Sequence, residues 1–189
     1  MIAGCLLGIV LAGIRTREIP VLNGLAKTYI NGFRSIPLVM VLLGFYLVVP
    51  AVIKPLFSIT GDIRLYCALI AFSLFEAAYI AEILRSGFNS IPKSQAMACK
   101  AMGLSTIQAY RQVLVPQALK NSFPVLVTQF IILLQDTSLV YVIGLTDFFG
   151  GMVKIGEMNG STSQMIVLAS TSYLVVFVLL QRAIERMKR

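Results

Sequence analysis

The feature that most constrains this chain is a series of long apolar runs with almost no charge. Residues 36–53 and residues 164–181 contain no charged side chain, and each run is 18 residues long. An apolar helix of about 18 or more residues is long enough to cross the hydrocarbon core of a bilayer. The whole chain is 58% hydrophobic and only 13% charged, which is too little polar surface for a water-soluble protein of 189 residues. The sequence therefore predicts an integral membrane protein.

Two further apolar runs are interrupted by single acidic residues. Residues 65–84 contain Glu76 and Glu82, and residues 121–145 contain Asp136. Both runs keep the length and composition of membrane-crossing helices. Because a charged group inside the hydrocarbon region is costly, each of these carboxylates is expected to face a partner group or a water-filled cavity.

The first apolar run, residues 1–14, is shorter than the others. As a helix it would be about 21 Å long, against about 30 Å for the hydrocarbon core. A signal peptide is the competing interpretation, but it would carry positive charge before the apolar stretch. In this chain Arg15 and Arg17 follow the stretch instead. We interpret the run as a short or truncated membrane helix.

Together the runs predict an all-α integral membrane protein with about five transmembrane helices in a single domain over residues 1–189. The expected spans are residues 1–14, 34–53, 65–86, 118–138 and 163–182.

The basic residues predict the orientation of the spans, because Lys and Arg in short loops stay on the cytoplasmic side. Thirteen of the sixteen lie in the first and third connections or at the carboxyl end: Arg15, Arg17, Lys27, Arg34, Arg85, Lys93, Lys100, Arg111, Lys120, Arg182, Arg186, Lys188 and Arg189. The other two connections hold only Lys54, Arg64 and Lys154. The amino terminus is therefore expected outside and the carboxyl terminus in the cytoplasm. The same rule accounts for the net charge of +8, so no nucleic-acid partner is expected.

The sequence contains none of the residue patterns that would indicate an enzyme. The chain has no histidine, and its three cysteines, Cys5, Cys67 and Cys99, form no C-x-x-C pair. Metal and disulfide chemistry therefore lack ligands. No phosphate-binding Gly-Lys loop, dinucleotide fingerprint or nucleophile–histidine set is present. We predict that the chain is not an enzyme and binds no cofactor of its own.

A polar segment between the third and fourth spans, residues 90–116, has the signals of two short helices. Asn89 or Ser90 is placed to cap the first helix, and Pro92 suits its first turn. Gly103 is placed to end that helix by taking a positive φ.

The second helix of this segment has its own start and stop signals. Ser105 and Gln108 have the spacing of a capping box, and Pro116 is expected to interrupt the helix that follows. We call residues 90–116 the two-helix loop. Helix chemistry alone leaves open whether it merely links two spans.

The two-helix loop resembles the cytoplasmic coupling loop of ABC importer permeases, whose pattern is Glu-Ala-Ala, three residues, Gly, nine residues and Ile-x-Leu-Pro. Here Met97-Ala98-Cys99 occupies the first triplet, Gly103 the glycine and Val113-Leu114-Val115-Pro116 the ending. Met97 stands where the family pattern has an acidic residue.

The resemblance extends over most of the chain. Residues 33–50, 72–95, 113–119 and 135–149 resemble the polar amino-acid branch of these permeases, and most of all its glutamate/aspartate members. The chain departs from that branch in having Gly44 and no tryptophan.

The resemblance implies a subunit of an ATP-driven amino-acid importer in the bacterial inner membrane. Its partners would be a second permease chain, cytoplasmic subunits that bind the ATP, and a periplasmic solute-binding protein. The residues implied in coupling to the ATPase are Ala96, Met97, Cys99, Lys100, Met102, Gly103 and Pro116, with Arg111 at the rim. A membrane scaffold derived from a permease, without a transport path, is the alternative.

A path for an acidic amino acid should offer cationic or N–H groups to its carboxylates. The residues expected to line a translocation path are Arg34, Glu76, Glu82, Asp136, Thr137 and Ser138. Arg34 would meet a carboxylate, although a basic residue of an inner loop also satisfies the orientation rule. Glu76 or Asp136 would meet the ammonium group. Glu82 lies three residues before Arg85, so an ion pair on one helix face is the competing interpretation.

Overall fold

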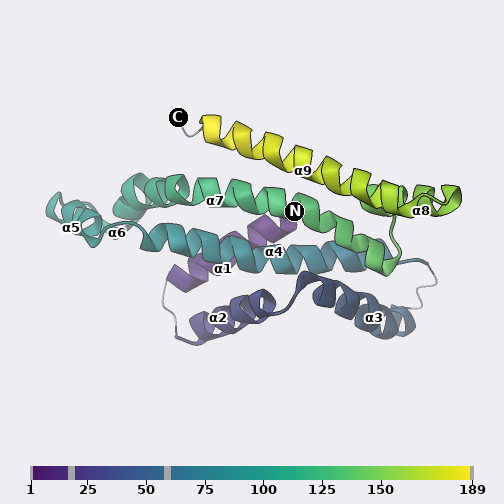
Figure 1. The fold of residues 1–189 in the computed structure, drawn as a ribbon. Coiled ribbons are helices and arrows are strands. Elements are labelled where there is room, and N and C mark those ends of the chain that lie inside the picture. Colours follow the sequence, from purple (N-terminus) through teal and green to yellow (C-terminus); the bar gives the residue numbers. More distant parts are fainter. Residues whose placement is uncertain (1, 17–19, 58–60, 188–189) are drawn as a thin grey trace. The chain divides into compact units, whose positions relative to one another are not determined.

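The computed structural model describes residues 2–16, 20–57 and 61–187, and every regular element in those ranges is a helix (Figure 1). The elements are α1 (Ile2–Thr16), α2 (Pro20–Ser35), α3 (Leu38–Phe57), α4 (Arg64–Asn89), α5 (Lys93–Ala101), α6 (Thr106–Ala109), the π-helix η1 (Tyr110–Leu114), α7 (Val115–Asp136), the 3-10 helix η2 (Thr137–Ile143), α8 (Phe148–Asn159) and α9 (Thr162–Met187). The predicted all-α class is confirmed.

Several of these helices have the length and composition that crossing a membrane requires. Four such stretches of the described chain are Leu38–Leu56, Arg64–Asn89, Thr106–Ile143 and Thr162–Arg186. The apolar helix Ile2–Thr16 is shorter. The structure thus agrees with the expectation of about five apolar helices, the first of them short.

The chain divides into two compact units. The first unit comprises residues 1–35 and 76–129, and the second unit comprises residues 36–75 and 130–189. Helices α4 and α7 therefore contribute residues to both units.

Close packing of α1 against α4 forms part of the first unit. Gly4, Gly8 and Ala12 lie four residues apart on α1, and all three are buried. A Cβ atom built on Gly8 would lie only 2.8 Å from the Cβ of Ile80, so the absence of a side chain allows the helices to approach. Ala12, Ile80 and Leu84 form a buried apolar cluster at the same contact. Small residues at this spacing permit such approach between apolar helices.

Helix α8 of the second unit is fixed at both ends and is joined to α9 by a side-chain hydrogen bond. The Asp147 side chain accepts hydrogen bonds from the backbone N–H groups of Phe149 (3.1 Å) and Gly150 (2.8 Å), which caps α8. The Tyr173 hydroxyl on α9 donates to the same carboxylate at 3.3 Å. Gly160, with φ of +63°, ends α8 in the left-handed conformation.

The second unit also ties the start of α4 to the turn after η2. The Arg64 guanidinium donates to the carbonyl oxygen of Gly144 at 2.9 Å and forms an ion pair with Asp62 at 2.8 Å. The hydrogen bonds from Arg64 hold the pKa of the exposed Asp62 carboxyl at about 2.

Two helices lie where the sequence suggested only connections. Helix α2 buries Ala26 and Ile30, which lie four residues apart and so share one helix face. Helix α8 lies between Asp147 and Gly160, which supply a start and a stop signal. Neither helix has the long uninterrupted apolar run by which the spans were recognised.

The expected span over residues 34–53 is displaced, and Arg34 belongs to a different helix than predicted. Arg34 lies in the last turn of α2, and the apolar helix α3 begins at Leu38. Pro37 explains the break, because the residue before a proline is driven out of the helical conformation. Of the basic residues used for the orientation, Arg17, Lys188 and Arg189 lie outside the described residues.

Candidate functional site

The two-helix loop joins α4 to α7, and Figure 1 shows α5 and α6 beyond the ends of these two helices. Helix α5 ends at a left-handed glycine, as predicted, with φ of +76° at Gly103. The backbone N–H of Gly103 donates to Lys100 and that of Leu104 donates to Cys99, which satisfies carbonyl groups at the helix end. The turn between α5 and α6 is therefore fixed by the backbone.

The predicted capping box at the start of α6 is confirmed. The backbone N–H of Gln108 donates to the Ser105 hydroxyl at 3.3 Å, and the Gln108 side chain accepts from the backbone N–H of Ser105 at 2.9 Å. The start of α6 is thus closed by a reciprocal pair of hydrogen bonds.

The predicted cap of α5 by Asn89 or Ser90 is wrong. The residue before α5 is Pro92, and no side chain caps the helix. The Ser90 hydroxyl donates to the Gly87 carbonyl at 2.7 Å and accepts from the Asn121 side chain at 2.8 Å instead. The side chain that local sequence assigned to the cap of α5 therefore bonds to a carbonyl of α4 and to a side chain of α7.

Pro116 does not interrupt the helix, contrary to the prediction. The chain stays helical from Thr106 to Ile143, and Pro116 lies in the first turn of α7. The turn just before it is the π-helix η1, in which the Val115 N–H donates to the Tyr110 carbonyl five residues earlier. A wider turn at this point allows the backbone to pass a residue that has no N–H to donate.

The side chains of the two-helix loop separate into a buried base and an exposed apolar surface. Cys99 and Ala109 are buried, with exposed fractions of 4% and 9%. Met97, Met102 and Ile107 are exposed to 64%, 78% and 79%. Because Cys99 is buried, it does not lie on the apolar surface that the sequence was expected to present.

The remaining expected coupling residues lie on the outside of the loop. Ala96, Lys100, Arg111 and Pro116 are exposed, and nothing lies within 4 Å of the position that a Cβ atom would take on Gly103. Ile107 was missed from the sequence. Ile107 could have been recognised, because it is an apolar residue in the first turn of the helix that the capping box predicts.

The acidic residues of α4 in the first unit have clear partners. The Glu76 carboxylate, 2% exposed, accepts a 3.1 Å hydrogen bond from the Gln129 side chain on α7, which confirms that it meets another helix. Glu82 accepts from the Arg85 Nε at 2.9 Å, which confirms the ion pair within α4.

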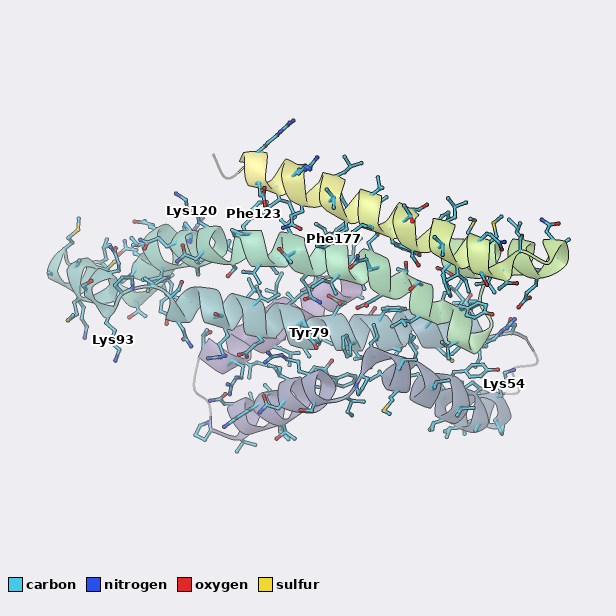
Figure 2. The ribbon with its side chains drawn as sticks, viewed as in Figure 1. Lys54, Tyr79, Lys93, Lys120, Phe123 and Phe177 are labelled. Carbon is cyan, nitrogen blue, oxygen red and sulfur yellow. The ribbon has the colours of Figure 1, made fainter. Side chains whose placement is uncertain are left out.

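Arg34 reaches the same acid from α2. One guanidinium nitrogen of Arg34 lies 3.6 Å from Glu82, and the guanidinium carbon lies 5.6 Å from the centre of the Tyr79 ring. Tyr79 is a residue of α4 (Figure 2). The structure therefore brings together two of the expected path residues, Arg34 and Glu82.

A cavity of about 320 Å³ opens beside this pair in the first unit. Its lining consists of Arg34, Glu82, Ile83, Ser86, Gly87, Ser90, Asn121, Ser122 and Val125. The lining thus offers a cation, a carboxylate, hydroxyl groups and an amide, which are the groups that a zwitterionic amino acid needs.

The remaining expected path residues lie in the second unit, where α7 passes into η2. Asp136 is the last residue of α7, and Thr137 and Ser138 begin the 3-10 helix. The Thr137 hydroxyl donates to the Leu134 carbonyl at 2.7 Å, so a side chain satisfies backbone where the helix type changes, as expected.

Comparison with known proteins places the chain among transport components. The family described as binding-protein-dependent transport system inner membrane component matches residues 4–189. The glutamate/aspartate import permease protein GltK of Escherichia coli O6:H1 is 43% identical over 191 residues, which cover 100% of this chain and 85% of the relative. The probable amino-acid permease protein YxeN of Bacillus subtilis is 34% identical, covering 98% of this chain and 83% of the relative.

Solved structures show the same fold. The crystal structure of an amino acid ABC transporter with histidines matches with a TM-score of 0.88 and 26% identity, covering 99% of this chain and 85% of that one. An inward-facing conformation of the MetNI methionine ABC transporter matches with a TM-score of 0.73 and 21% identity, covering 97% and 83%. The second similarity concerns the fold alone.

Proposed function

Since the chain belongs to the family of binding-protein-dependent transport system inner membrane components, we propose that it forms the membrane path of an ATP-driven importer for glutamate and aspartate. The chain is an amino-acid ABC transporter permease subunit and not an enzyme. The observation that carries the substrate proposal is the 43% identity over the whole chain to a glutamate/aspartate import permease.

The proposed assembly contains more than this chain. A second permease chain completes the path, cytoplasmic subunits bind and hydrolyse the ATP, and a periplasmic solute-binding protein delivers the amino acid. In the bacterial inner membrane the amino terminus faces outward and the carboxyl terminus faces the cytoplasm, as the distribution of Lys and Arg supports. This orientation puts the two-helix loop on the cytoplasmic side.

The two-helix loop is proposed to dock on the ATPase subunit. Met97, Met102 and Ile107 would supply the contact, because large apolar side chains exposed on a polar segment are typical of protein interfaces. Lys100 and Arg111 would lie at the polar rim, and Ala96 beside Met97. Their exposure supports this arrangement.

The frame of the loop is proposed to transmit the movement of the ATPase. We call Met97, Met102 and Ile107 the docking surface. The left-handed turn at Gly103 and the continuous helix through Pro116 join this surface to α7, so most of the connecting backbone is held in regular structure. Cys99 serves this frame as a buried packing residue. Coupling of this kind requires a rigid element that contacts both the ATPase and the membrane helices.

The cavity beside Arg34 is proposed as part of the path. A substrate carboxylate would bind the Arg34 guanidinium, whose distance of 3.6 Å from Glu82 leaves N–H donors for a second partner. Glu82 and Glu76 would balance the charge along α4. Asp136, Thr137 and Ser138 are proposed to line the path within the second unit.

Reconstitution tests the proposal. The chain is co-expressed with the ATPase, the solute-binding protein and any second permease from neighbouring coding sequences. Uptake of labelled glutamate and aspartate into proteoliposomes is then measured with and without ATP. ATP-dependent uptake of both amino acids is expected. An assembled complex with no uptake of any amino acid would favour the scaffold, and uptake of another amino acid alone would overturn the substrate proposal.

A further inference from the structure

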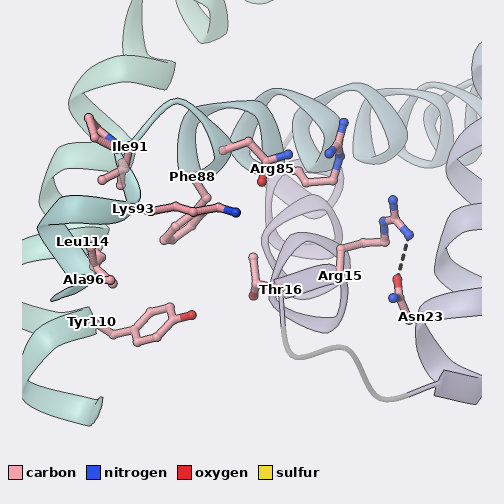
Figure 3. A pocket seen from close by; sticks show the side chains of 12 residues that line it. Arg15, Thr16, Asn23, Arg85, Phe88, Ile91, Lys93, Ala96, Tyr110 and Leu114 are labelled. Atoms are coloured by element: carbon pink, nitrogen blue, oxygen red, sulfur yellow. Dashed lines mark hydrogen bonds between the residues drawn. The ribbon is translucent and has the colours of Figure 1, made fainter. Parts of the chain in front are cut away.

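A second cavity of the first unit, about 460 Å³ in volume, lies between the ends of α1 and α4 and the start of α5 (Figure 3). Its polar lining includes Arg15, Thr16, Asn23, Asn89, Lys93 and Tyr110. Its volume is in the range of small-ligand sites. Neither Arg34 nor Glu82 lines it, so it is distinct from the cavity proposed for the path.

The charge of this cavity is positive, and an acidic residue outside the lining, Glu82, interacts electrostatically with both Arg85 and Arg15. None of the twelve residues that line it is acidic. Arg85, a third cation of the lining, is already paired with Glu82. Arg15 and Lys93 form no ion pair with any described residue, and Figure 3 shows the Lys93 side chain extending from α5 into the space beside Arg85. Two positive charges thus remain available to a ligand.

Arg15 also has a hydrogen-bond donor without a partner. Its terminal nitrogen donates to the Asn23 side chain at 2.6 Å, which holds the guanidinium in place (Figure 3). Its Nε atom is buried and finds no acceptor among the described residues. A buried donor left unpaired is costly, so an arrangement of the cavity that gives this nitrogen an acceptor would be favoured.

The position of the cavity indicates which acceptors can reach it. Arg15 lies in the last turn of α1, and Phe88 and Asn89 lie in the last turn of α4. The ends of apolar helices lie at the level of the lipid headgroups. Basic pockets between membrane helices at this level bind the phosphate groups of anionic lipids.

We propose that this cavity binds a phosphate-bearing anion at the membrane surface, either the headgroup of an anionic phospholipid or a free phosphate. The anion meets the Lys93 ammonium and the Arg15 guanidinium, and the Thr16 and Tyr110 hydroxyl groups border the same space. Since the lining comes from α1, α2, α4, α5 and η1, an occupied cavity would hold the two-helix loop against the helices of the first unit.

The experiment measures retained lipid on the purified importer complex. The complex is exchanged into detergent containing equal amounts of phosphatidylglycerol and phosphatidylcholine, and bound lipid is counted by native mass spectrometry. Preferential retention of phosphatidylglycerol is expected, with about fivefold weaker retention for each positive charge removed by Lys93→Gln or Arg15→Gln. Lys93 is exposed, so Lys93→Gln removes charge without disturbing the fold.

Lys120→Gln is the matched control, because Lys120 is an exposed lysine that does not line the cavity. It should retain phosphatidylglycerol as the unmodified chain does. A separate arm measures thermal stabilisation by inorganic phosphate. Stabilisation that Lys93→Gln abolishes, without any lipid preference, would identify free phosphate as the ligand. Equal behaviour of all variants in both arms would overturn the proposal, and neither arm depends on transport.

Discussion

The Glu76 carboxylate on α4 accepts a 3.1 Å hydrogen bond from the Gln129 side chain on α7, and both residues are at least nine-tenths buried. This contact joins two helices of the first unit. It also gives a partner to a carboxyl group whose burial in a membrane helix is otherwise unfavourable. The carboxylate keeps its place because the neighbouring helix supplies a donor.

Gln129→Leu is therefore expected to destabilise the protein by about 1–3 kcal/mol, because it removes a donor from a buried acceptor while keeping the side-chain volume similar. The measurement is the thermal unfolding midpoint in detergent. Thr128→Val is the control, since the Thr128 hydroxyl is exposed and donates to the Pro124 carbonyl of its own helix. Equal midpoints for both variants would show that the contact with Glu76 is energetically neutral.

Arg34→Ala is expected to reduce uptake of glutamate and aspartate at least tenfold without loss of assembly. The guanidinium is the cation of the 320 Å³ cavity, while Glu82 keeps Arg85 as its partner when Arg34 is removed. Uptake into proteoliposomes is measured at equal amounts of complex. Lys27→Ala, which removes an exposed cation from the same helix, should leave uptake unchanged. Normal uptake by Arg34→Ala would remove this residue from the path.

Gly87→Ala is expected to destabilise the first unit by about 1–3 kcal/mol through overpacking. A Cβ atom on Gly87 would lie 1.8 Å from the Ser122 hydroxyl oxygen and 2.7 Å from the Ala118 carbonyl oxygen. The Ser122 side chain is 1% exposed and bonded to the Ile83 carbonyl, and the Ala118 oxygen belongs to the backbone, so neither neighbour moves aside freely. Gly13→Ala is the control, because nothing lies within 4 Å of its Cβ position. Thermal unfolding of the two variants should differ in sign, since alanine in an open helical site is favourable.

The parts of the candidate site that involve residues close together in the sequence could be predicted from the sequence. Gly103, the Ser105–Gln108 box and the Glu82–Arg85 pair each involve residues within a few positions of one another, and the structure contains all three. Such features depend on backbone geometry and side-chain reach along one helix. They do not depend on how the helices pack.

The features that sequence reasoning missed depend on contacts between distant segments. The meeting of Arg34 with Glu82 requires α2, a helix without a long apolar run, to pack beside α4. Ser90 was assigned to a helix cap but bonds to Asn121, 31 positions away. The passage of the helix through Pro116 depends on a π turn whose wider spacing is not apparent from residue types.

The docking surface of the two-helix loop yields a prediction about its neighbour in the complex. Met97→Cys and Ile107→Cys should crosslink to the ATPase subunit through a short bifunctional thiol reagent, because both positions are more than 60% exposed beside the buried Cys99. Crosslinked products are detected by mass spectrometry of the purified complex. Cys99 itself, 4% exposed, should react slowly, so the unmodified chain gives a low background from this loop.

Met158→Cys provides the matched control for these crosslinks. Met158 is a methionine of α8 exposed to 79%, but it lies in the connection that the distribution of basic residues places outside the cell. It should react with a membrane-impermeant thiol reagent added to intact cells and should give no crosslink to the ATPase. Met97→Cys should show the opposite pattern, because both residues are exposed methionines and the orientation places them on opposite sides of the membrane. Labelling of Met97→Cys by the reagent outside the cell would contradict both the orientation and the coupling mechanism. Protection of both cysteine variants from the reagent would contradict only the outside location of α8.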